Sequence, residues 1–65
     1  MQLWLSQKWI DKMVNLPESG MGYQNVTVRL KNGTVLRGIV INSDTLQVNG
    51  HVIFSNDEIN DISVI

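Results

Sequence analysis

The side chains of this sequence that could carry out covalent or metal chemistry are few. The chain has one histidine, His51, and no cysteine, which excludes disulfides, thiolate ligands and cysteine nucleophiles. A zinc site would need a set of carboxylates that converge on His51. A nucleophile and its base would need His51 beside Ser43 or Ser55 and an orienting acid, and no segment indicates that grouping or an oxyanion hole. We therefore expect no enzyme activity, no cofactor, no bound metal and no small-molecule substrate.

Charged side chains could support binding, but their balance is not typical of a nucleic-acid-binding domain. The chain has five basic and six acidic side chains and a formal net charge of −1. Nucleic-acid-binding domains usually have a basic excess, because they must neutralise phosphates. The charges are unevenly placed: Arg29, Lys31 and Arg37 lie in the central stretch 26–44, whereas acidic residues cluster in 57–61. Any phosphate contact is therefore expected from the central stretch.

The length restricts the chain to a single domain, residues 1–65, because domains typically begin at about 50 residues. A core of this size rarely contributes more than about 3–5 kcal/mol, so small folds usually add disulfides, a metal or partner subunits. The chain has no cysteine and 43% of its residues are hydrophobic. Oligomerisation is the remaining source of stability, and we expect a homo-oligomer.

Two observations bear on where the protein resides. No apolar segment approaches the roughly 18 residues of a membrane span. The first residues, MQLWLSQK, lack the basic region and the long apolar segment of a signal peptide. We expect no membrane partner and a soluble protein of cytoplasmic type.

Residues 6–16 are predicted to form a short amphipathic helix. Ser6 is a good N-cap residue, and Pro17 lies just beyond the other end, where it stops a helix. The apolar stripe, spaced at the helical period, consists of Trp9, Ile10, Met13 and Val14. A helix this short is marginal in water, so we expect its stripe to cover an open end of a sheet. A helix that binds a partner is the alternative.

Residues 24–31 alternate between apolar and polar side chains and predict a strand that an Asn-Gly turn connects to a second strand. A two-residue loop would pair Val28 with Arg37 and place that arginine on the core face. A three-residue loop with a left-handed Gly33 would pair Val28 with Leu36 and turn Arg37 outward. We favour the three-residue loop, because it keeps the core face apolar.

The second strand has a glycine in its middle. Gly38 weakens a strand and usually marks a bend or close packing, and a long strand bent at a glycine lets a small sheet wrap into a barrel. On the opposite face Val35, Ile39 and Ile41 are apolar where a solvated face would be polar. This row suggests that the face is covered by the helix, by the curl of the sheet or by a neighbouring subunit.

Three further short strands complete the expected fold. The predicted elements after the second strand are a turn at 42–45, a strand at 46–48, a hairpin turn at 49–50, a strand at 51–54, a helical or 3₁₀ turn at 55–58 and a strand at 62–65. The fold class is therefore mostly β with an N-terminal α-helix. We expect a five-stranded, strongly bent antiparallel SH3-like barrel in residues 24–65.

This order of elements resembles the Sm-like family of small barrels, which includes the Sm, LSm and Hfq proteins. The residues that carry the resemblance are those of the first Sm motif: the run Leu30-Lys31-Asn32-Gly33, then Gly38, then Asp44. The similarity covers about residues 24–49. It implies an Sm-like barrel, assembly into a homo-oligomeric ring and single-stranded RNA as a second candidate partner.

The ligand-binding positions of the family match less well. Val48 stands where the family has the asparagine that holds an RNA base, and Asn49 follows it. An acidic segment, 54–58, stands where the second motif has an Arg-Gly-Asn-like run. If RNA binds by the family's route, the implied contacts are Arg29, Lys31, Arg37, Asp44 and Asn49.

Assembly is expected to use the fourth and fifth strands, whose unpaired edges a neighbouring subunit can extend. The candidate interface residues are Ile39, Ile41, Val52, Phe54 and Val64. Homo-oligomeric assembly or binding is thus the expected function, and RNA binding by a ring-shaped oligomer is the alternative.

Overall fold

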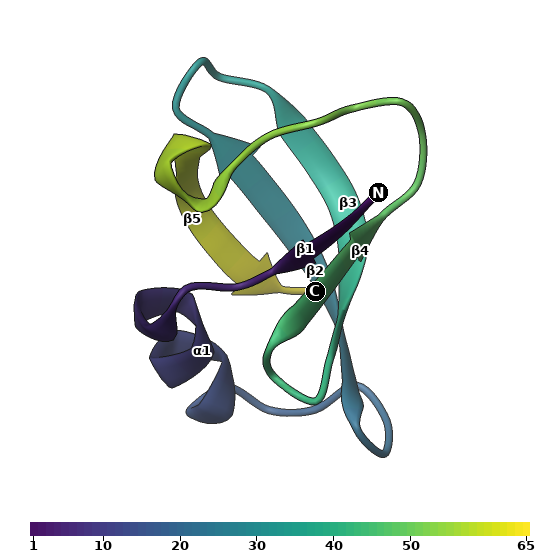
Figure 1. Ribbon diagram of the computed structural model, residues 1–65. Helices are drawn as coiled ribbons and strands as arrows, with labels where there is room; N and C mark the ends of the chain where they lie inside the picture. The colour runs from purple at the N-terminus through teal and green to yellow at the C-terminus, as the bar shows by residue number, and fades with distance from the viewer.

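The structure, a computed structural model that describes residues 1–65, is mostly β, with one sheet and one α-helix (Figure 1). In chain order the elements are β1 (Gln2–Trp4), α1 (Gln7–Val14), β2 (Tyr23–Leu30), β3 (Val35–Ile41), β4 (Thr45–Val48), the 3₁₀ turn η1 (Asn56–Glu58) and β5 (Ile59–Val64). The five strands are antiparallel, in the order β1-β4-β3-β2-β5. This confirms the expected antiparallel fold with an N-terminal helix. The edge strands β1 and β5 do not pair, so the sheet is open.

The core lies on the inner face of the curled sheet, and α1 sits at one end of it (Figure 1). The buried hydrophobic side chains are Leu5, Trp9, Met13, Val26, Val28, Leu30, Val40, Leu46, Val48, Phe54, Ile59 and Ile62. Trp9 and Met13 of α1 are buried and Ile10 packs against the core, as expected for the apolar stripe, but the prediction was wrong for Val14, which is exposed. Ser6 occupies the N-cap position, although its side chain makes no capping hydrogen bond.

The hairpin between β2 and β3 has the expected three-residue loop. The Leu30 amide donates to the Thr34 carbonyl at 2.8 Å, and Val28 lies opposite Leu36. Gly33 has a φ of +94°, the left-handed conformation that this loop requires. Arg37 consequently points away from the core.

Gly38 lies close to the backbone of β4. It pairs with Val26 on one side and with Val48 on the other. A Cβ atom at this position would lie 2.5 Å from the backbone carbonyl oxygen of Gln47, too near for any side chain. Close packing between strands therefore explains the glycine in the middle of β3.

The prediction of a strand at residues 51–54 is wrong. That segment forms no strand, and the open edge of β4 is occupied by β1, a strand that was not predicted. The segment that fills this edge must place an apolar side chain beside Leu46, and β1 does so with Leu3. Phe54 instead enters the core, where it is 5% exposed.

The helical turn and the final strand were predicted close to their observed positions. The helical turn expected at 55–58 is η1, and the final strand follows it directly. That strand, β5, begins at Ile59 rather than at residue 62. It pairs with β2, with Val28 opposite Ile62, and leaves its other edge unpaired.

Candidate binding surface

The outer face of the sheet, opposite the core, contains two cross-strand rows without a charged side chain. Pairing across four strands aligns Trp4, Thr45, Ile41 and Tyr23 in one row, and Gln2, Gln47, Ile39 and Asn25 in the next. We call these eight residues the uncharged zone. Residues directly opposite one another in antiparallel strands point to the same face, so each row forms a continuous stripe.

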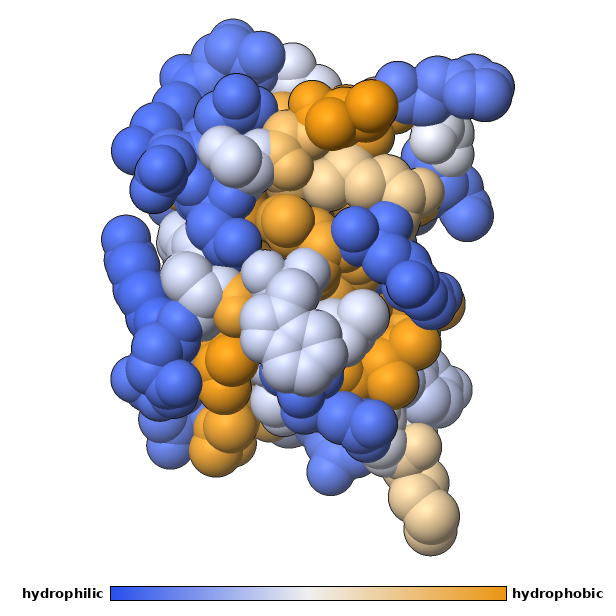
Figure 2. All heavy atoms as spheres, in the orientation of Figure 1, coloured by the Kyte–Doolittle hydropathy of each residue, from blue (hydrophilic) through white to orange (hydrophobic).

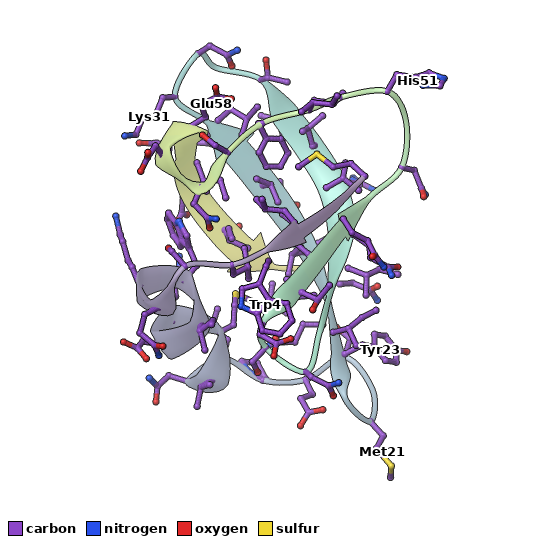
Figure 3. The ribbon with its side chains drawn as sticks, viewed as in Figure 1. Trp4, Met21, Tyr23, Lys31, His51 and Glu58 are labelled. Carbon is purple, nitrogen blue, oxygen red and sulfur yellow. The ribbon has the colours of Figure 1, made fainter.

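Large apolar side chains of the uncharged zone are exposed. Trp4 is 69% exposed, Tyr23 40% and Ile39 39%. In Figure 3 the Trp4 ring lies at the front of the molecule, and Tyr23 projects at its lower right. Figure 2, in the same orientation, shows hydrophobic surface down the middle of this view and hydrophilic surface around it; apart from Ile39 and Ile41, the residues of the uncharged zone are pale or blue on this scale. A solvated sheet face normally carries polar side chains, whereas interface cores have few charges and are rich in aromatic residues.

Opposite charges border the two ends of the uncharged zone. Arg37 and Arg29 continue the outer face toward the β2–β3 loop, and neither forms a salt bridge. At the other end, the Asp44 carboxylate accepts a hydrogen bond from the Thr45 hydroxyl at 2.9 Å. The Glu18 carboxylate lies at the same end, where it accepts the Gly22 amide. The outer face thus has a basic end, an uncharged middle and an acidic end.

The structure does not bring the five predicted RNA contacts together. Arg29 and Arg37 share the outer face, while Lys31 lies in the loop beyond it, beside Glu58 (Figure 3). Asp44 lies at the opposite end of β3, and the exposed Asn49 follows β4. The four steps along the strand from Arg37 to Ile41 alone span about 13 Å.

The predicted interface residues also separate. Ile39 and Ile41 lie in the uncharged zone, whereas Val52 and Val64 pack against the core and Phe54 is buried in it. The aromatic members of the uncharged zone were not singled out from the sequence. Trp4 was missed because β1 was not predicted, and its alternation with Leu3 was the signal that could have found it. Tyr23 was missed because the strand was predicted to begin at residue 24, whereas β2 begins at Tyr23.

Two shallow pockets lie at the ends of the sheet, and only the second shares a residue, Tyr23, with the uncharged zone. One, of about 350 Å³, lies between the β2–β3 loop and η1 and is lined by Leu30, Lys31, Asn32, Asp57 and Glu58. The other, of about 230 Å³, is lined by Glu18, Gly22, Tyr23, Gln24, Asn42 and Ser43. His51 projects from an exposed loop (Figure 3). No group of three histidine or acidic side chains converges to hold a metal ion.

One ion pair ties the helix to the sheet near the basic end. The Lys12 ammonium donates a hydrogen bond to the Asp61 carboxylate, and both side chains are partly exposed. This hydrogen bond holds the pKa of Asp61 below its ordinary value, although burial partly opposes the shift. Asp61 also lies opposite Arg29 across the β2–β5 pairing, so Arg37 is the arginine of the basic end that has no acidic residue opposite it.

Comparisons of this chain with protein-family models, curated proteins and solved structures find no match. No helix of the chain is long and apolar enough to cross a membrane. The Sm-like resemblance thus rests on residues 24–49 of the sequence alone.

Proposed function

We propose that this protein is a small homo-oligomeric assembly module that associates through the uncharged zone of its sheet. The observation that carries the proposal is the exposure of Trp4, Tyr23 and Ile39 on a sheet face that has no charge between its two ends. Burial of such side chains contributes about 25 cal/mol per Å² of apolar surface removed from water. Copies that hide this face from water are therefore favoured over isolated chains.

The size of the core supports the same proposal. A domain of about this length buries only about 60% of the surface that its unfolded chain exposes. The buried hydrophobic cluster has 12 members, and several large apolar side chains remain outside it. Association would bury apolar surface that one chain cannot bury alone. The free energy gained by this burial must exceed the roughly 4–15 kcal/mol that two chains lose in translational and rotational freedom when they associate.

The finer proposal is that the open sheet is an Sm-like, SH3-like barrel. The order of helix, bent hairpin, short strands and 3₁₀ turn supports it, together with the Gly33, Gly38 and Asp44 spacing. The departure is β1, which occupies the edge where a strand from 51–54 was expected. The free edge of β5 offers a second route for association.

Sedimentation equilibrium over micromolar concentrations tests the assembly proposal. We expect a mass above the 7.3 kDa of one chain, falling on dilution. Ile39→Lys should shift the protein to monomer with its circular dichroism unchanged, because a lysine would bury its charge against an apolar surface. Thr34→Lys is the matched control, since Thr34 is exposed in the β2–β3 loop, outside the uncharged zone. A wild-type protein that stays monomeric throughout would refute the proposal.

RNA binding is the competing outcome, because Arg29 and Arg37 form no salt bridge and share the outer face with the exposed aromatic residues, although these lie toward its other end. Titration of Trp fluorescence with uridine- or adenine-rich oligonucleotides, at low and moderate salt, distinguishes the two functions. We expect no change. Binding that weakens as salt rises would indicate phosphate contacts and replace assembly with RNA binding as the leading function.

A further inference from the structure

The charges that border the uncharged zone make its outer face asymmetric along the strands. From one end to the other, β3 presents Arg37, Ile39 and Ile41, and the turn after β3 leads to Asp44. Successive outer-face residues on a strand are about 7 Å apart. A point midway between Ile39 and Ile41 is therefore about as far from Arg37 as from the turn that carries Asp44.

We infer that two copies pack outer face to outer face about a two-fold axis between Ile39 and Ile41, so that Arg37 of each copy meets Asp44 of the other. This inference rests on the proposed function and specifies its partner as a second copy of this chain. A two-fold axis at this point places Ile39 over Ile41 of the second copy and brings the β3 parts of the two uncharged zones together. The same operation carries each basic end onto an acidic end.

Charge complementarity favours this orientation over the reverse one. If the two faces packed with their strands pointing the same way, Arg37 would lie over Arg37 and Asp44 over Asp44. Like charges brought together across an interface disfavour an orientation, and opposite charges select it. The two-fold arrangement produces the Arg37–Asp44 contact twice, and Glu18 adds a second carboxylate to each acidic end.

The polar side chains of the uncharged zone are compatible with the same partner. Gln2, Gln47 and Asn25 flank the apolar residues, and each side-chain amide both donates and accepts hydrogen bonds. Two copies of such a face can therefore donate hydrogen bonds to each other and accept them from each other. A face lined with carboxylates alone could not, because ionised carboxylates only accept.

Charge reversal with rescue tests the arrangement. Arg37→Glu and Asp44→Arg should each raise the dimer dissociation constant at low salt by about five-fold or more. The double variant Arg37→Glu/Asp44→Arg restores opposite charges and should return the dissociation constant to within about two-fold of wild type. Lys31→Glu is the matched control, because Lys31 lies beyond the outer face beside Glu58 and its reversal should leave association unchanged.

Thermal unfolding of every variant checks that the fold survives, and Glu18→Lys replaces Asp44→Arg if the latter does not fold. A wild-type mass of two chains with rescue in the double variant is the expected result. Single reversals without effect, or a double variant no better than the singles, would overturn the two-fold arrangement while leaving self-association intact. A mass above two chains would overturn it in favour of edge-to-edge assembly. A monomeric wild type would instead refute the proposed function itself.

Discussion

At the scale of single residues, Gln24 is the one polar side chain buried in this protein, and it is 2% exposed. Its Nε2 atom donates to the carbonyl oxygens of Met13, Leu16 and Pro17 at 3.0, 3.1 and 3.3 Å. The last carbonyls of a helix have no partner within the helix. The Gln24 amide supplies one, and it thereby joins the end of α1 to the first inward position of β2.

Gln24→Leu should lower the free energy of unfolding by about 1–3 kcal/mol, because the partly buried carbonyl groups of Leu16 and Pro17 lose their donor, while that of Met13 keeps the Leu16 amide. Urea denaturation followed by circular dichroism measures the change. Gln7→Leu is the control, since Gln7 is exposed on α1 and its replacement should stay within about 0.5 kcal/mol. A Gln24→Leu protein as stable as wild type would show that these hydrogen bonds do not stabilise the helix end.

At the scale of elements, β1 is held on both sides by different chemistry. One edge of the strand pairs with β4, and the backbone at its other edge contacts the side chain of Asn56 from η1. Asn56 Oδ1 accepts the Ser6 amide at 2.8 Å, and Asn56 Nδ2 donates to the Trp4 carbonyl at 3.0 Å. This amide makes the two hydrogen bonds that a neighbouring strand would make. It therefore links the edge that carries Trp4 to the segment before β5.

Asn56→Ala should destabilise the protein by about 1–2 kcal/mol, since each lost hydrogen bond contributes about 1 kcal/mol. Hydrogen exchange should show faster exchange of the Ser6 amide. Asn56→Asp keeps the acceptor for Ser6 but loses the donor to Trp4, so its stability should lie between those of wild type and Asn56→Ala. Asn60→Ala on β5 serves as the exposed control. Equal stability of all four proteins would rule out a role for Asn56 in holding β1.

At the scale of the whole molecule, the Lys12–Asp61 ion pair joins the N-terminal helix to the last strand. The hydrogen bond from Lys12 lowers the pKa of Asp61 from its ordinary value of 3.8. A carboxyl group whose pKa is lower in the folded state stabilises the fold above the unfolded pKa. That contribution disappears as the pH falls through the folded pKa.

Asp61→Asn should therefore cost a few tenths of a kcal/mol at about pH 7, as expected of a partly exposed ion pair, and almost nothing at about pH 2. Urea denaturation at the two pH values gives the comparison. Asp57→Asn removes the same charge from η1 without breaking an ion pair. A cost that stayed the same at both pH values would mean that the ion pair is not the source of the stability.

Much of this fold was predictable because short-range patterns determine local geometry. Alternation in residues 24–31 predicted β2 and its inward face, and the need to keep Arg37 out of the core selected the three-residue loop. The turn at 42–45 and the helical turn before β5 also follow from residues close together in the chain. The candidate site was predictable only in part: Ile39 and Ile41 were recognised as apolar residues on the outer face.

The sequence by itself determined that this protein is mostly β and antiparallel, that it has one helix near its N-terminus, and that Gly38 lies in the middle of a strand. Only the tertiary structure decided which segment occupies the free edge of β4, because β1 and the segment 51–54 compete for it and their local patterns do not rank them. That pairing places Trp4 on the same outer-face row as Tyr23. The uncharged zone is therefore a product of long-range pairing, which no local pattern of the sequence contains.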